Sequence, residues 1–293
     1  MALAALSGDE QCVIFVQLCN VLDPDFAVAF SSASNELWTA TQAPRQQLQA
    51  DYEAARALAR KAGMRSCKGL REVMKVVWRH KGLSSDDLSL LGTLGSVLPA
   101  LEQLILCESV AGPDGVQRLA EKLVAGALPA VTSLRLSRME VGYAGASALA
   151  LALDRGALPR LKSLGLTHAA IGDAGLVALA PALRRRPALE VLDLENNPFG
   201  EEGLAALVAP LPTAGAEAGA PPPTAGVMAK LMSLDLSFTS ITDAGCASLA
   251  STLDSGALPV LESLYLVGTP ANAAAKSTVR RAILGRWCDV RVR

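Results

Sequence analysis

The chain has 293 residues and a formal net charge of -1, a balance with no bias toward nucleic acid or an acidic membrane. Hydrophobic residues make up 51% of it but aromatic residues only 4%, and this excess of Leu, Ala and Val suits many thin, similar layers better than one deep core. We therefore expect a modular protein that binds neither nucleic acid nor a membrane.

The N-terminal segment, residues 1–66, has a helical pattern. Its most apolar stretch is interrupted by polar residues and follows no basic region, so it predicts neither a signal peptide nor a membrane span. A first helix and a second short helix are separated by Asp23-Pro24, and their apolar positions are Ile14, Phe15, Leu18, Leu22, Phe26 and Phe30.

This order of I-F-x-x-L, L-D-P-x-D and a later Trp38 resembles an F-box, although the Leu-Pro that opens an F-box is missing. The resemblance implies docking onto a Skp1-like adaptor of a ubiquitin ligase through a group of partly exposed side chains: Ile14, Leu18, Leu22, Pro24 and Phe26. Three short amphipathic helices also commonly cap a solenoid, and that alternative buries the same side chains. The sequence leaves both interpretations open.

A longer helix is predicted next, in "RQQLQADYEAARALARKAG". It begins after Pro44 and ends at Gly63, and one face carries Leu48, Tyr52, Ala55, Ala59 and Ala62. A degenerate first repeat, residues 67–97, follows with Val73, Val76 and Trp78 in the positions that leucines occupy later.

An L-x-x-L-x-L pattern recurs six times over residues 98–270, beginning at Leu101, Val131, Leu161, Leu189, Leu231 and Leu261. The intervals are 30, 30, 28, 42 and 30 residues. Each copy predicts a short strand, a tight turn and a helix, and the helix ends at Gly-Ala-Leu-Pro or Arg-Arg-Pro, after which proline should return the chain to an extended form. One unit of this size cannot bury its own apolar face, so the copies must stack.

The pattern resembles the leucine-rich repeat of the long, helix-containing subtype found in ribonuclease inhibitor. The resemblance implies a right-handed α/β solenoid, or horseshoe, with a parallel inner sheet and outer helices. A buried Asn or Cys usually follows each strand, and here only Asn197 offers a full side-chain amide, which argues against a continuous asparagine ladder. The 42-residue interval holds a Pro, Gly and Ala-rich loop at 212–226, and residues 271–293 are expected to form a C-terminal cap with a closing strand at Cys288, Val290 and Val292.

Side chains between the strand leucines point away from the helices, so they are the candidate binding surface. The concave face is basic early and acidic late, and Asp193 and Asp235 should be neighbours on adjacent strands. A basic group on a protein partner would relieve their repulsion. The candidate contact residues are Arg135, Arg138, His168, Asp193, Glu195, Asn196, Asp235, Phe238 and Tyr265.

Catalysis is not expected, because His168 has no Ser or Cys nucleophile placed beside it and the carboxylates lack the spacing of a metal loop. We expect no cofactor and no metal. A GTPase-activating activity of the Ran type would rest on the family analogy alone, with Arg138 and Asn196 as its candidates. The six cysteines show no metal-ligand spacing, which favours reduced thiols in a monomeric cytoplasmic or nuclear protein.

Overall fold

The structure, a computed structural model, describes residues 6–61, 63–107, 110–112, 114–209 and 228–284. The predicted loop at 212–226 and the predicted closing strand at Cys288, Val290 and Val292 lie outside these residues. The proposed division of the chain into domains stays a prediction.

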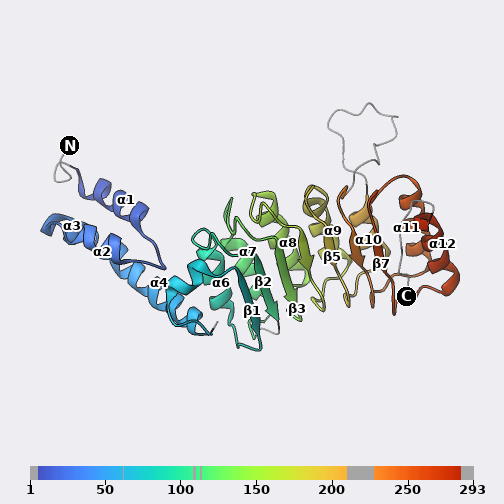
Figure 1. The fold of residues 1–293 in the computed structure, drawn as a ribbon, viewed down its shortest axis with the longest axis horizontal. Helices are drawn as coiled ribbons and strands as arrows, with labels where there is room; N and C mark the ends of the chain where they lie inside the picture. The colour runs from blue at the N-terminus through green and yellow to red at the C-terminus, as the bar shows by residue number, and fades with distance from the viewer. Residues whose placement is uncertain (1–5, 62, 108–109, 113, 210–227, 285–293) are drawn as a thin grey trace, which may run out of the picture.

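A seven-stranded parallel sheet runs along one side of the molecule, and its strand order follows the order of the chain (Figure 1). The degenerate repeat supplies the first strand and each later repeat supplies one more, which confirms the predicted stacking. The strands are β1 (Lys75–Arg79), β2 (Gln103–Cys107), β3 (Ser133–Ser137), β4 (Ser163–Gly165), β5 (Val191–Asp193), β6 (Ser233–Asp235) and β7 (Ser263–Tyr265).

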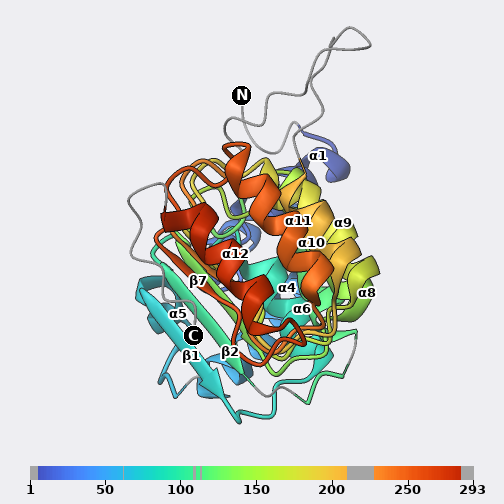
Figure 2. The ribbon, with the colours of Figure 1, turned by 90° about the vertical axis from the view of Figure 1, so that its right-hand side faces the viewer.

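Helices from the repeats lie against one face of the sheet and leave the other face open (Figure 2). They are α6 (Ser85–Leu94), α7 (Gly115–Lys122), α8 (Gly142–Asp154), α9 (Asp173–Arg184), α10 (Glu201–Val208), α11 (Asp243–Asp254) and α12 (Ala273–Leu284). The strand leucines are buried between the sheet and these helices. The α/β solenoid expected from the sequence is thus confirmed.

In the helices α7 to α11, a glycine in the first turn lets the helix begin close to the turn that precedes it. A Cβ added to Gly115 would lie only 2.4 Å from the Cβ of Ala111, and one added to Gly245 would lie 2.8 Å from Cγ2 of Ile241. The recurring glycines therefore shape the connection between strand and helix rather than bind phosphate, as their spacing predicted.

The connection from helix to strand differs from the expectation. Gly156 ends its helix with φ of +89°, as predicted, but Leu158 before the proline has φ of +52° instead of an extended conformation. The leucine N–H donates a hydrogen bond to the carbonyl of Ala127 in the preceding repeat, at 3.0 Å, and its side chain is fully buried. Burial and this inter-repeat hydrogen bond together hold Leu158 in a conformation that leucine rarely adopts.

Asn197 forms the hydrogen bonds expected of a single ladder residue. Its Oδ1 accepts from the N–H groups of Ala169 and Ile171 at 3.1 and 3.0 Å, and its Nδ2 donates to the carbonyls of Leu166, Leu194 and Glu195. The threonines in the same position of the last two repeats bond only to carbonyls within their own repeat. Asn197 therefore links two repeats where its counterparts do not.

Five helices precede the sheet, and the first three extend beyond the stack (Figure 1). They are α1 (Gly8–Leu18), α2 (Asp25–Ser31), α3 (Asn35–Ala40), α4 (Gln42–Lys61) and α5 (Cys67–Glu72). Helix α4 starts two residues before Pro44 rather than after it, because proline is tolerated in the first turn of a helix. Leu22, predicted on the first helix, lies in the turn after α1 and is buried.

Helix α4 joins two separate apolar cores. Leu48 packs with Phe15 of α1 and Ala27 of α2, whereas Ala55 and Leu58, further along the same helix, belong to the continuous core of the solenoid. Lys61 at the end of α4 forms an ion pair with Asp87 of α6. Helices α1 and α2 thus form a small unit with its own core, and it is held to the stack through α4 and through Leu22, which belongs to the solenoid core.

Candidate functional site

The predicted row of outward-facing residues is formed on the open face of the sheet. In the strand register Arg135 lies opposite Gly165, Gly165 opposite Asp193, Asp193 opposite Asp235, and Asp235 opposite Tyr265. Adjacent strands are about 4.8 Å apart, so the row places the side chains of five repeats side by side. We call this surface the open face.

Three carboxylates converge in the acidic half of the row. Oxygen atoms of Asp193, Glu195 and Asp235, which we call the acidic cluster, all lie within 4.8 Å of one another, and all three residues are half-buried. The predicted proximity of Asp193 and Asp235 is confirmed, and Glu195 joins them from two residues further along the chain. Among the described residues, this is the only group of at least three His, Cys, Asp or Glu side chains close enough to hold a metal ion.

Burial and mutual repulsion raise the pKa of Glu195. Partial burial has the largest effect, the charges of Asp235 and Asp193 follow, and the nearby His168 opposes the rise. Within the cluster, Asp193 Oδ1 accepts from the Glu195 N–H at 3.1 Å, and Asp235 Oδ1 accepts from the Ser237 N–H at 2.9 Å. These hydrogen bonds fix the directions of the carboxylates without neutralising them.

A second row follows the ends of the strands, where the chain turns toward the helices. Arg138, His168, Asn196 and Phe238 each occupy the same place in successive repeats, and each has φ between 52° and 56°. All four side chains are exposed. The left-handed turn therefore directs one side chain per repeat to the rim of the open face, which groups the sequence-predicted candidates into a strand row and a rim row.

The aromatic candidates lie at the end of both rows. Tyr265 is half-buried on β7, and the Phe238 side chain is 50% exposed. A Cβ on Gly268 would lie 2.4 Å from Cδ1 of Phe238, so the ring lies directly against the backbone of the next repeat. Glycine at that position is what leaves room for the ring.

The candidates in the N-terminal helices are divided between core and surface. Leu22 is buried, whereas Ile14, Leu18 and Pro24 are half-buried and Phe26 is 69% exposed. Whether these side chains bind an adaptor or belong to a cap of the solenoid stays a prediction.

The exposed apolar surface of these helices is larger than the sequence pattern indicated. Val13, Val16, Val28 and Trp38 are 39–62% exposed. The Arg45 guanidinium lies 3.3 Å from the Trp38 ring centroid and covers one face of the indole. The sequence contained a signal for this surface, since Val13 and Val16 flank the inward-facing Phe15 at positions that cannot face the same core.

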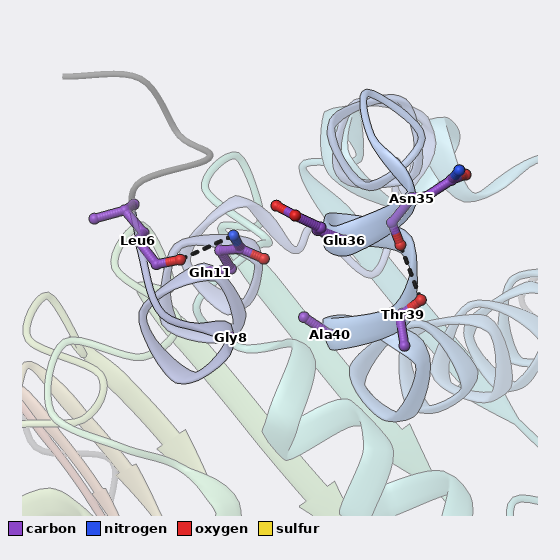
Figure 3. A pocket seen from close by; sticks show the side chains of 7 residues that line it. All are labelled: Leu6, Gly8, Gln11, Asn35, Glu36, Thr39 and Ala40. Carbon is purple, nitrogen blue, oxygen red and sulfur yellow. Dashed lines mark hydrogen bonds between the residues drawn. The ribbon is translucent and has the colours of Figure 1, made fainter.

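A hollow between α1 and α3 lies beside this surface (Figure 3). It is lined by Leu6, Gly8, Gln11, Asn35, Glu36, Thr39 and Ala40. Gln11 donates to the carbonyl of Leu6 and Thr39 to that of Asn35, so these polar groups bond within their own segments. Among the described residues that line this hollow, none is a nucleophile hydrogen-bonded to a general base.

The five cysteines in the described residues are free. Burial raises the pKa of the Cys246 thiol, which faces the core as predicted. No helix among the described residues is long and apolar enough to cross a membrane.

Comparisons with known proteins support the repeat assignment. The leucine-rich-repeat family model matches residues 158–180, 187–208 and 227–250, so these three segments are similar to leucine-rich repeats. A comparison with curated proteins gave no match. Among solved structures, actin-binding site 2 of leiomodin-1 is 14% identical, with a TM-score of 0.38, over 53% of this chain and 80% of that one; at this similarity it carries no argument about function.

Proposed function

We propose that this protein is a non-enzymatic binding module that holds a basic group of a protein partner on its open face. The observation that carries the proposal is the convergence of three carboxylate side chains within 4.8 Å on an exposed sheet face. Like charges held this close repel one another, and a Lys or Arg of the partner relieves the repulsion. Leucine-rich repeats generally serve in protein–protein interaction, which agrees with this assignment.

The test compares two charge-reversal variants in a pull-down from cell extract. In the first, Asp193→Lys and Asp235→Lys reverse the acidic cluster. In the control, Glu202→Lys and Asp254→Lys make the same change in net charge on exposed positions of α10 and α11, on the helical side of the stack. The proposal expects the first variant alone to lose its bound protein, while circular dichroism shows both to be folded. The proposal is wrong if both variants retain the bound protein equally, or if both lose it equally.

The exposure of the N-terminal helices favours a second candidate function, substrate reception for a ubiquitin ligase. In this proposal the Skp1-like adaptor binds α1–α3 and the open face binds the protein to be modified. Phe26 is the most informative residue, because a core residue would not be 69% exposed. The small separate core beneath these helices further supports a docking unit rather than a cover for the stack.

Binding to purified adaptor, measured by calorimetry, tests this second function. Phe26→Asp should abolish binding without unfolding the protein, since the ring is mostly in solvent. Val124→Asp, at a position that is 58% exposed after α7, provides the control and should bind as the parent does. If the adaptor does not bind the parent chain, the second proposed function is wrong. The Ran-type GTPase-activating alternative has no support beyond the rim positions of Arg138 and Asn196.

A further inference from the structure

The open face carries an ordered series of chemical groups along the direction of stacking. The row reads Arg135, Gly165, Asp193, Asp235, Tyr265 on β3 to β7. It begins with a cation, continues through an uncharged strand to two anions, and ends with an aromatic ring. A partner that complements the row must carry the matching groups in the matching order.

Arg135 extends along this row toward the carboxylates. A Cβ added to Gly165 on the next strand would lie 3.1 Å from Cγ and 3.7 Å from Cδ of Arg135, so the aliphatic part of the arginine lies over the glycine. Arg135 is exposed, and among the described residues no salt bridge within 4.0 Å joins it to the acidic cluster. The guanidinium is therefore available to an anionic group of a partner.

The acidic cluster likewise has no lysine or arginine partner among the described residues. Within the described part of the chain, no Lys or Arg forms a salt bridge with Asp193, Glu195 or Asp235. Arg135 and the midpoint of the two aspartates are two and a half strands apart, which is about 12 Å. The face therefore holds Arg135, a site for an anionic group, and the acidic cluster, a site for a cationic group, on strands whose register is fixed.

Two aromatic side chains lie beside the acidic cluster. Tyr265 follows Asp235 in the row, and Phe238 lies three residues beyond Asp235 at the rim. Phe238 keeps a large aromatic ring half in solvent at φ of +54°, a conformation that disfavours bulky residues. Exposed aromatic rings beside charged groups are typical anchors of protein interfaces.

We propose that the open face binds an extended segment that carries an acidic side chain, a basic side chain about four residues further on, and an apolar side chain just after it. Side chains four residues apart in a strand point the same way and are about 13 Å apart, which matches the backbone separation between Arg135 and the two aspartates. The acidic group contacts Arg135, the basic group contacts the acidic cluster, and the apolar group contacts Phe238. This inference rests on the proposed function and adds the sequence pattern of the partner.

A fluorescent peptide with this pattern provides the test: aspartate, three spacer residues, arginine, one spacer and leucine. A second peptide replaces the aspartate by asparagine. Both are titrated by fluorescence anisotropy at low salt into the parent protein and into Arg135→Gln. We expect the aspartate peptide to bind the parent about three- to tenfold more tightly than the asparagine peptide does, and the difference to vanish in Arg135→Gln.

The apolar contact has its own variant. Phe238→Gly removes the ring and also the left-handed strain, so the thermal midpoint should hold or rise while affinity for the leucine peptide falls. A residue with a merely structural role would lower the thermal midpoint instead. Affinity that is unchanged in Phe238→Gly contradicts the apolar contact.

The outcomes separate this inference from the proposed function. If both peptides bind the parent equally and the variant with Asp193→Lys and Asp235→Lys binds neither, the acidic cluster does bind a basic group but the proposed pattern of the partner is wrong. If a scrambled peptide of the same composition binds as well as the ordered one, the proposed order is wrong. If none of the peptides binds and charge reversal also leaves the pull-down unchanged, both the inference and the proposed function are wrong.

Discussion

Replacing Asn197 by alanine should destabilise the solenoid more than the same replacement of the threonines that occupy this position in the last two repeats. The side chain is 1% exposed and accepts hydrogen bonds from the N–H groups of Ala169 and Ile171. Alanine leaves both buried donors without this acceptor, at about 1–3 kcal/mol each. We therefore expect the free energy of unfolding to fall by about 2–5 kcal/mol.

Thr239→Ala is the matched control. Thr239 occupies the same position in the next repeat and is also buried, but its hydroxyl only donates to the carbonyl of Leu236, at 2.7 Å. Losing that one bond should cost about 1 kcal/mol. Urea unfolding followed by circular dichroism measures the global effect of both variants.

Hydrogen exchange adds a local measurement, which is useful because repeat arrays can unfold in parts. In Asn197→Ala, the amides of Ala169 and Ile171 should exchange at least about tenfold faster, the factor that corresponds to 1.4 kcal/mol. Amides of the first repeats should change less. The reasoning is refuted if Asn197→Ala and Thr239→Ala cost the same, or if the two amides keep their protection.

Two further substitutions test the charges and the packing. Asp235→Asn should raise the free energy of unfolding by a few tenths to about 1 kcal/mol at neutral pH, because like charges directly opposite each other in a sheet repel. Because the pKa of Glu195 is raised in the folded state, the folded protein holds the Glu195 proton more tightly than the unfolded chain does, and the stability of the parent falls as pH rises from the usual carboxyl pKa to the raised one. Asp235→Asn should make this fall in stability less steep in denaturation curves measured across that pH interval. An unchanged slope contradicts the repulsion between Asp235 and Glu195. Gly115→Ala should cost about 1–3 kcal/mol by overpacking against Ala111. Gly172→Ala adds a Cβ that meets nothing within 4 Å, so it should cost only the roughly 0.5–1 kcal/mol expected of alanine at a helix N-cap. Similar thermal midpoints for the two variants contradict the close-packing argument.

The sequence pattern of the N-terminal helices predicted their positions but not how they pack. The positions of the helices followed from Pro24 and from the apolar spacing, but the same spacing fits both a cap and a docking unit. The structure distinguishes them through helix α4, where Leu48 packs in the small N-terminal core and Leu58 packs in the solenoid core. That choice depends on the angle between helices, which no local pattern specifies.

The amino-acid sequence by itself determined the stack and its register. Leucines that recur in one pattern must be buried by neighbouring repeats, and aligning that pattern places Asp193 beside Asp235 across the 42-residue interval and makes Asn197 the one ladder amide. Only the tertiary structure decided that Glu195 completes the acidic cluster, that Arg135 lies over Gly165, and that Leu158 turns left-handed before its proline. These features depend on side-chain direction and on contacts between repeats, which arise only when the strands are packed at their actual distance and twist.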